Sequence, residues 1–149
     1  MLSSPNLIIE GSHPYGDDEV WDLAMWLCNN ILPDEGYEIV VTFRKFTKKH
    51  DGYQHGNHIS MDRYSHEIEI SNSLKLSEAL IALVHEFVHV KQYMVGYITE
   101  EGKKTFWMGE EVPDNTYYFD RPWEQHARLM EQIYYNQYLR TNSLNLSKS

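Results

Sequence analysis

The sequence predicts a single α+β domain in which three helices accompany a small, mainly antiparallel sheet. The chain has 149 residues, a length that fits one domain, and 42% of them are hydrophobic, which is enough to fill one core. Two segments have the apolar pattern of an amphipathic or a buried helix, and a third has Pro122 in its first turn, a position that favours proline. Between the first two of these, short segments rich in β-branched and aromatic residues indicate strands.

The first expected helix covers residues 17–32. Asp17 and Asp18 lie at its N-terminal end, where the helix dipole favours carboxylates, and Pro33 follows its last turn. Cys28 is the single cysteine of the chain and falls on the apolar stripe of this helix. We therefore interpret it as a core residue rather than a nucleophile or a metal ligand.

Three strands are expected next, over residues 37–46, 53–61 and 66–71. The third alternates isoleucines with glutamates, and turn-like residues at 50–52 favour antiparallel pairing between neighbours. Histidines cluster in this region. We interpret them as surface or turn residues, with a second metal site as the alternative; they are His55, His58 and His66.

The strongest helix signal covers residues 77–95. Ser77 is suited to cap it and Gly96 to end it. Its apolar residues extend nearly all the way round, which predicts a central, buried helix. Residues 97–108 then form an expected hairpin with its turn near Gly102, and a last helix is expected over residues 122–140.

The central helix carries the motif His85-Glu86-Phe87-Val88-His89. Histidines four residues apart project from the same helix face, so both imidazoles can reach one metal ion. Glu86 is placed to take a proton from a water on that metal. Because two histidines and a glutamate are costly to bury in so apolar a segment unless something binds them, the pattern favours a metal site.

A catalytic zinc site needs a third protein ligand and one open position. We expect Glu124, in the first turn of the last helix, to be this ligand, because Ala127 one turn later is small enough to let two helices approach closely. Glu124 as a simple helix-start carboxylate is one alternative. His126 as the third ligand is the other, but it points about 200° around the helix from Glu124.

This combination resembles a known family. His85-Glu86-x-x-His89, followed by a helical Glu124-x-x-Ala127, is similar to the zincin metallopeptidases, and in particular to their gluzincin-like branch, with small phage-encoded and SprT-like peptidases as the nearest likeness. The resemblance covers residues 77–96 and 121–127. It implies a zincin-like fold, Zn²⁺ bound by the two histidines and Glu124, and Glu86 as general base. SprT-like proteins usually use a histidine as third ligand, which keeps His126 open.

The expected activity is zinc-dependent hydrolysis of peptide bonds in a peptide or protein substrate. Zinc lowers the pKa of a coordinated water, and Glu86 takes the proton from that water and later delivers it to the leaving amine. Glu131 and Asp120 are the carboxylates most suited to orient the histidines. His126 or a tyrosine from an aromatic set could polarise the carbonyl; the set is Trp107, Tyr117, Tyr118, Phe119 and Trp123.

The composition of the chain limits the classes of partner and the cellular compartment that we expect. The net charge of -9 repels phosphate backbones, so nucleic acid is not an expected partner, which argues against the alternative of a SprT-like protease acting on DNA-bound proteins. A single cysteine excludes an internal disulfide framework. No apolar segment could span a membrane and no secretory signal is visible, so we expect a cytoplasmic protein. A zinc-binding, partner-binding module without turnover is the other alternative.

Overall fold

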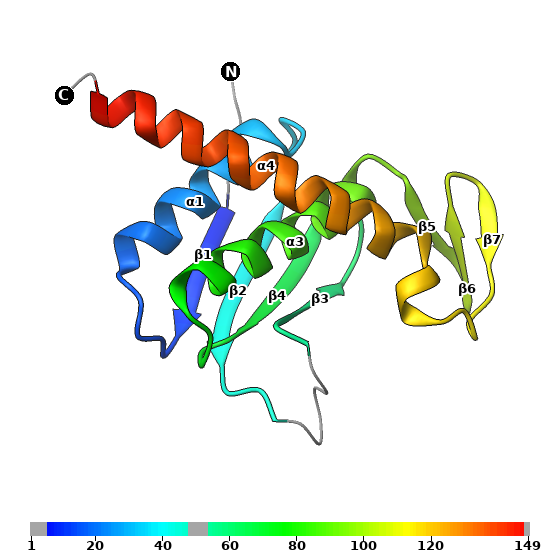
Figure 1. The fold of residues 1–149 in the computed structure, drawn as a ribbon. Coiled ribbons are helices and arrows are strands. Elements are labelled where there is room, and N and C mark those ends of the chain that lie inside the picture. Colours follow the sequence, from blue (N-terminus) through cyan, green and yellow to red (C-terminus); the bar gives the residue numbers. More distant parts are fainter. Residues whose placement is uncertain (1–5, 48–53, 148–149) are drawn as a thin grey trace.

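The computed structural model describes residues 6–47 and 54–147 (Figure 1). Its base is a four-stranded sheet in the order β1-β2-β4-β3. The strands β1 (Asn6–Gly11), β2 (Glu38–Arg44) and β4 (Ser65–Ser71) are parallel, whereas β3 (Gly56–Ser60) pairs antiparallel with β4 at one edge. The prediction of a mainly antiparallel sheet is therefore wrong for this sheet.

The order of the strands explains the difference. The prediction assumed that consecutive strands pair, but β2 and β3 are not neighbours, because β4 lies between them. β1, which was not among the expected elements, reaches β2 through a helical crossover, and such a connection is what parallel strands require. The expected turn at residues 50–52 lies outside the described residues.

Three helices pack against the sheet and one another. α1 (Asp17–Asn30) and α3 (Leu76–Met94) lie on one face of the sheet, and α4 (Pro122–Ser147) crosses over both of them (Figure 1). The contact between α1 and α4 includes the rings of Trp26 and Tyr138, whose centroids are 5.7 Å apart. All three helices were expected. α3 begins earlier than predicted, with Lys75 rather than Ser77 as its N-cap.

The core fills the space between the sheet and the helices. Alternate residues of β2 and β4, such as Ile39 and Ile68, are fully buried beneath Leu83 and Phe87 of α3. The alternation arises because successive side chains of a strand point to opposite faces. Cys28 belongs to this core, as predicted.

A separate antiparallel sheet follows α3. It contains β5 (Ile98–Glu101), β6 (Lys104–Trp107) and β7 (Glu110–Val112), so the predicted hairpin is confirmed and one strand longer than expected. The short 3-10 helix η1 (Tyr118–Asp120) then leads into the first turn of α4. Among the helices that the structure describes, none combines the length and the apolar character needed to cross a membrane.

Candidate metal centre

The candidate site lies where α3 meets the beginning of α4. His85 and His89 are one turn apart on α3, and their ring centroids are 4.9 Å from each other. Glu124 is placed in the first turn of α4. Ala127, one turn further on, is completely buried, and its small side chain lets the two helices approach. The structure thus brings together the three residues that the sequence singled out as metal ligands.

Glu124 bridges the two histidines. One carboxylate oxygen, Oε1, lies 3.0 Å from Nε2 of His85, and the other, Oε2, lies 3.1 Å from Nε2 of His89. The three potential ligand atoms are all within 4.8 Å of one another. Ligands at about 2.0–2.2 Å from one tetrahedral zinc ion are separated by about 3.4 Å, so only small shifts would be needed to hold an ion.

Each histidine is held through its other ring nitrogen. Nδ1 of His85 donates to Oε1 of Glu131 at 3.2 Å, and Nδ1 of His89 donates to Oε1 of Gln92 at 2.8 Å. Glu131 therefore lies where the sequence placed it. These bonds orient both rings so that their Nε2 atoms face the Glu124 carboxylate. Metal-binding histidines are commonly held by such a second hydrogen bond.

Gln92 was missed by the sequence analysis. It is fully buried, and its amide nitrogen donates to the carbonyl oxygen of Trp123 at 3.0 Å and to Nδ1 of His126 at 2.8 Å. Because both contacts need a donor, the amide oxygen must face His89. The one signal in the sequence was a polar residue three positions after His89 in an otherwise apolar helix.

His126, the alternative third ligand, is not part of the cluster. Its ring packs against Tyr97 and Trp107, with centroid distances of 5.9 Å and 5.5 Å. Gln92 connects it to the site, because the Gln92 amide bonds to both His126 and His89. Asp120 lies in η1, and within the described part of the chain it forms no hydrogen bond to either histidine of the motif.

The electrostatics of the cluster are those of a cation site. Burial lowers the pKa of His85, but hydrogen bonds to Glu124 and Glu131 outweigh burial and raise this pKa to about 10. Burial also lowers the pKa of His89, but the hydrogen bond to Glu124 and the negative charges of Glu86 and Glu124 together raise this pKa above its usual value. Burial raises the pKa of Glu124, yet its bonds to the two histidines bring it well below the usual range. Protonated imidazoles thus face the carboxylates of Glu124 and Glu131, and a divalent cation could replace their protons.

Glu86 is buried beside the cluster without belonging to it. Only 5% of the residue is exposed, and burial raises the pKa of its carboxyl group although His89 and His85 act in the opposite direction. β3 approaches it closely: a Cβ at Gly56 would lie 3.0 Å from Oε2 of Glu86. Because glycine has no side chain, the carboxylate of Glu86 fits beside Gly56 without a clash.

Two cavities meet at Glu86. The first, of about 550 Å³, is mainly apolar and lies on the His85 side, with Ile81, Ala82 and Phe119 in its wall. The second, of about 240 Å³, is polar and lies on the His89 side. Tyr118 lines both cavities, and its hydroxyl donates to Oε1 of Glu124 at 3.0 Å. Among the aromatic residues considered from the sequence, Tyr118 is therefore the one placed at the cluster.

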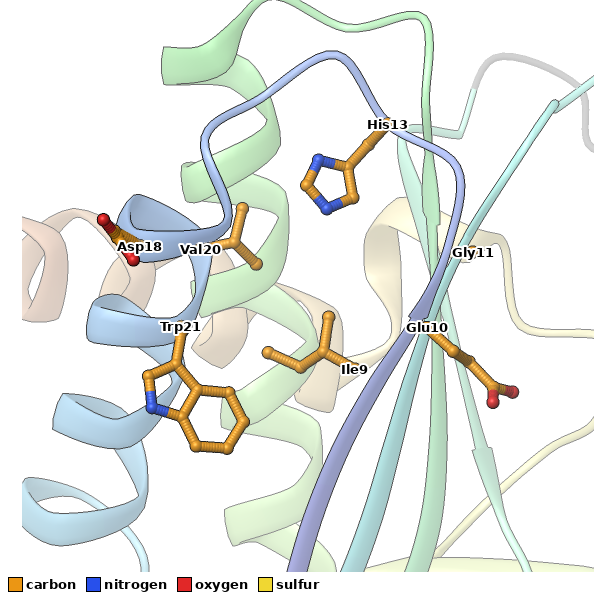
Figure 2. A pocket seen from close by; sticks show the side chains of 7 residues that line it. All are labelled: Ile9, Glu10, Gly11, His13, Asp18, Val20 and Trp21. Carbon is orange, nitrogen blue, oxygen red and sulfur yellow. The ribbon is translucent and has the colours of Figure 1, made fainter.

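A further cavity, of about 560 Å³, lies elsewhere. Figure 2 shows its lining between the end of β1 and the first turns of α1, with Trp21 and Ile9 beside each other and the carboxylates of Glu10 and Asp18 pointing outward. It shares no residue with the cluster of His85, His89 and Glu124. Its walls belong to the opposite end of the fold from α4's first turn (Figure 1).

Comparisons of this chain with protein-family models, with curated proteins and with solved structures found no match. The case for a function therefore depends on the geometry of the cluster and on the chemistry of its residues.

Proposed function

We propose that this protein is a zinc-dependent metallopeptidase. The observation that carries the proposal is the bridge from Glu124 to both motif histidines, which joins residues 39 and 35 positions apart in the sequence through contacts of 3.0 and 3.1 Å. The resemblance of the motif and of Glu124-x-x-Ala127 to the gluzincin-like zincins supports the same function.

The donor set suits zinc better than the other common divalent ions. Two imidazole nitrogens and one carboxylate oxygen are ligands of catalytic zinc, whereas calcium and magnesium prefer oxygen ligands alone. Three protein ligands would leave one position open, as catalytic sites do and structural sites do not. Glu131 and Gln92 already hold the imidazoles with Nε2 toward the common point.

Two residues of the chain have proposed roles in the hydrolysis beside the metal ligands, namely Glu86 and Tyr118. His85, His89 and Glu124 would hold the zinc ion, which would act as a Lewis acid toward water and a peptide carbonyl. Glu86, which is buried beside the cluster, accepts the proton of the attacking water and passes it to the leaving amine. The Tyr118 hydroxyl, which donates to Glu124, is placed to donate to the developing oxyanion instead.

A peptide is the substrate class that the surroundings favour. Glu86 lines both the apolar and the polar cavity. An extended chain crossing Glu86 could place one side chain in each cavity. The net charge of -9 disfavours a phosphate-rich substrate.

Two measurements test the proposal. Elemental analysis of purified protein should give about one zinc per chain. Zinc-loaded protein, incubated with a complex mixture of peptides and analysed by mass spectrometry, should produce new termini that disappear with a chelator.

Glu86→Gln is the control for the mechanism, because glutamine keeps the size of the side chain and cannot accept the proton. Cleavage should fall by at least ~10²-fold while zinc remains bound. Equal cleavage by parent and variant would contradict the mechanism. Zinc binding without any cleavage would favour the zinc-binding module without turnover.

A further inference from the structure

A partly buried arginine in the wall of the polar cavity has no role in the mechanism described so far. Arg121 lies at the junction between η1 and α4. Its backbone N–H donates to the carbonyl oxygen of Tyr118 at 3.3 Å. Its own carbonyl oxygen accepts from the N–H groups of Glu124 and Gln125, at 3.0 and 3.1 Å. Because both backbone groups are used, Arg121 can offer only its side chain to a molecule in the cavity.

The guanidinium group of Arg121 is held at Nε and free at its two terminal amino groups. Nε donates to the carbonyl oxygen of Thr116 at 3.2 Å, and the guanidinium carbon lies 5.7 Å from the centroid of the Tyr118 ring, which lines the same cavity. Within the described residues, the amino groups form no hydrogen bond and no ion pair. No buried side-chain nitrogen in this part of the chain lacks a partner, so these amino groups must be accessible to solvent or to a ligand.

Trp123 contributes a second unused donor to the same wall. Its indole N–H has no hydrogen-bond partner among the described residues. The hydroxyl groups of Tyr93 and Tyr118, in contrast, already donate to glutamates at 2.8 and 3.0 Å. The donors left free in this wall therefore include a charged guanidinium group and an indole N–H.

Arg121 is the one permanently charged cation among the described residues that line the polar cavity. His58 also lines it, but its Nε2 lies 2.9 Å from Nδ1 of His66, which is only 1% exposed. The interpretation of His58 and His66 as surface or turn histidines is therefore wrong, whereas His55 is exposed, as expected. Among the described residues, neither ring belongs to the group whose ligand atoms converge.

A carboxylate is the ligand group that fits this wall. A guanidinium fork matches the two oxygens of a carboxylate, and such charged hydrogen bonds are stronger than bonds to a neutral carbonyl group. Glu124 is already bonded to both motif histidines, and neither it nor Glu86 forms an ion pair with Arg121. The net charge of -9 disfavours a polyanion but not a single carboxylate next to an arginine.

The small size of the cavity keeps this carboxylate close to the reacting groups. Its volume is about 240 Å³, below the ~300–1,000 Å³ of sites for drug-sized ligands, and Glu86, His89 and Glu124 belong to the same wall. The cavity can therefore hold only a short piece of a peptide. Two parts of a peptide can supply the carboxylate: the C-terminus, or the side chain of an aspartate or glutamate.

We propose that the polar cavity selects substrates with a carboxylate next to the scissile peptide bond, and that Arg121 is the specificity-determining residue that binds it. The proposal rests on the proposed peptidase function. A bound C-terminus would make the enzyme release short fragments from the end of a chain. A bound side chain would direct cleavage to acidic residues.

The first test measures carboxylate binding without any cleavage. The probes are N-acetylalanine and its uncharged amide, added to zinc-loaded and to metal-free protein. The readout is the indole signal of Trp123 in nitrogen-15 NMR, identified by its loss in Trp123→Phe. N-acetylalanine should shift this signal saturably in both forms, and the amide should bind at least about tenfold more weakly. No saturable shift with N-acetylalanine would overturn the proposal, whether or not the protein cleaves peptides.

Three variants show whether Arg121 is responsible. Arg121→Gln should weaken N-acetylalanine at least about tenfold and remove its advantage over the amide. Arg121→Lys keeps the charge without the fork, so its affinity should lie between those of the parent and of Arg121→Gln, and it replaces that variant if glutamine prevents folding. Arg128→Gln is the matched control, because Arg128 lines the apolar cavity and also forms no ion pair among the described residues. It should keep the parent affinity. Parent affinity in the Arg121 variants, as expected of a carboxylate bound to zinc alone, would overturn the proposal.

The second test identifies the source of the carboxylate. Peptides of one sequence carry a free or an amidated C-terminus, and an aspartate or an asparagine at one internal position. The parent should favour one of the two acids at least about tenfold in kcat/KM, and the favoured acid names the source. Arg121→Gln should lose this preference through a higher KM, whereas Arg128→Gln should keep it.

The two tests separate the possible failures. Cleavage of all four peptides without preference for either acid would overturn this proposal and leave the peptidase function intact. Binding of N-acetylalanine that depends on Arg121, without cleavage of any peptide, would support the carboxylate site and contradict the peptidase function.

Discussion

Three ionisable side chains are joined at the candidate metal centre. Buried charges are costly when isolated, but Glu124 bonds to both His85 and His89. Removing any one of the three breaks at least one of these contacts. Substitutions at this cluster therefore need a control for folding, and the chain offers one in His126.

Glu124→Ala and His126→Ala form a matched pair, because the two residues share the first turns of α4. We expect Glu124→Ala to weaken zinc binding by more than the ~10–100-fold typical of losing an outer partner. His126→Ala removes the acceptor for Gln92 and the ring contacts with Tyr97 and Trp107, which lie outside the cluster, so the affinity should stay within about tenfold of the parent value. Zinc titrations, with folding checked by circular dichroism, measure both. If His126→Ala lost zinc and Glu124→Ala kept it, the third ligand would be His126 and not Glu124.

Glu131 permits a finer test at the same scale. Its carboxylate accepts from Nδ1 of His85 at 3.2 Å and so fixes the orientation of the ring. Glu131→Ala should weaken zinc binding about tenfold, whereas Glu131→Gln, which keeps an acceptor oxygen, should bind nearly as tightly as the parent protein. Competition with a fluorescent chelator measures the difference. Equal affinities in both variants would show that the ring needs no such partner.

At the scale of elements, the site depends on how closely separate segments approach. Ala127 brings α4 to α3, and Gly56 brings β3 to Glu86. The same principle holds at the other edge of the sheet. Gly11, at the end of β1, has a φ of +96°, and a Cβ there would lie 2.1 Å from the carbonyl oxygen of Phe43.

Gly11→Ala should therefore reduce the free energy of unfolding by about 2 kcal/mol or more, because it combines a left-handed backbone with a backbone clash. Gly36→Ala is the control, since a Cβ at Gly36 meets nothing within 4 Å. That variant should change stability by about 0.5 kcal/mol at most. Urea unfolding followed by circular dichroism compares them. A Gly11 variant as stable as the control would mean that β1 does not pair with β2 in this register.

At the scale of the whole molecule, the cluster of His85, His89 and Glu124 joins the last helix to α3. α4 contributes Glu124, whereas α3 and the sheet form the core on which it packs. A ligand that binds only the folded chain stabilises it by mass action. Zinc should therefore act on the stability of the complete domain and not only on the site.

The thermal midpoint gives a direct measure. At a free zinc concentration 100 times the dissociation constant, the gain is about 2.7 kcal/mol. For a chain of this length that corresponds to a rise in Tm of about 5–10 °C. Glu124→Ala should lose most of this rise, and Glu86→Gln should keep it. A rise of the same size in Glu124→Ala would place the zinc elsewhere.

Much of the local structure and of the candidate site could be predicted from the sequence. α1, α3, α4 and the β5–β6 hairpin depend on periodicity and on turn residues within one segment, and these are local signals. The motif histidines and Glu124 could be paired because a helix places residues at i and i+4 on one face, and because a small residue at 127 indicates close packing.

Only the tertiary structure decided the order of the strands and the surroundings of the site. β1 and the parallel pairing of β2 with β4 depend on contacts between segments far apart in the chain, which local patterns do not contain. Gln92 and His58 are ordinary polar residues in the sequence. Folding brings them to polar partners, which polar groups inside a protein need: Gln92 bonds to His89, and His58 bonds to His66.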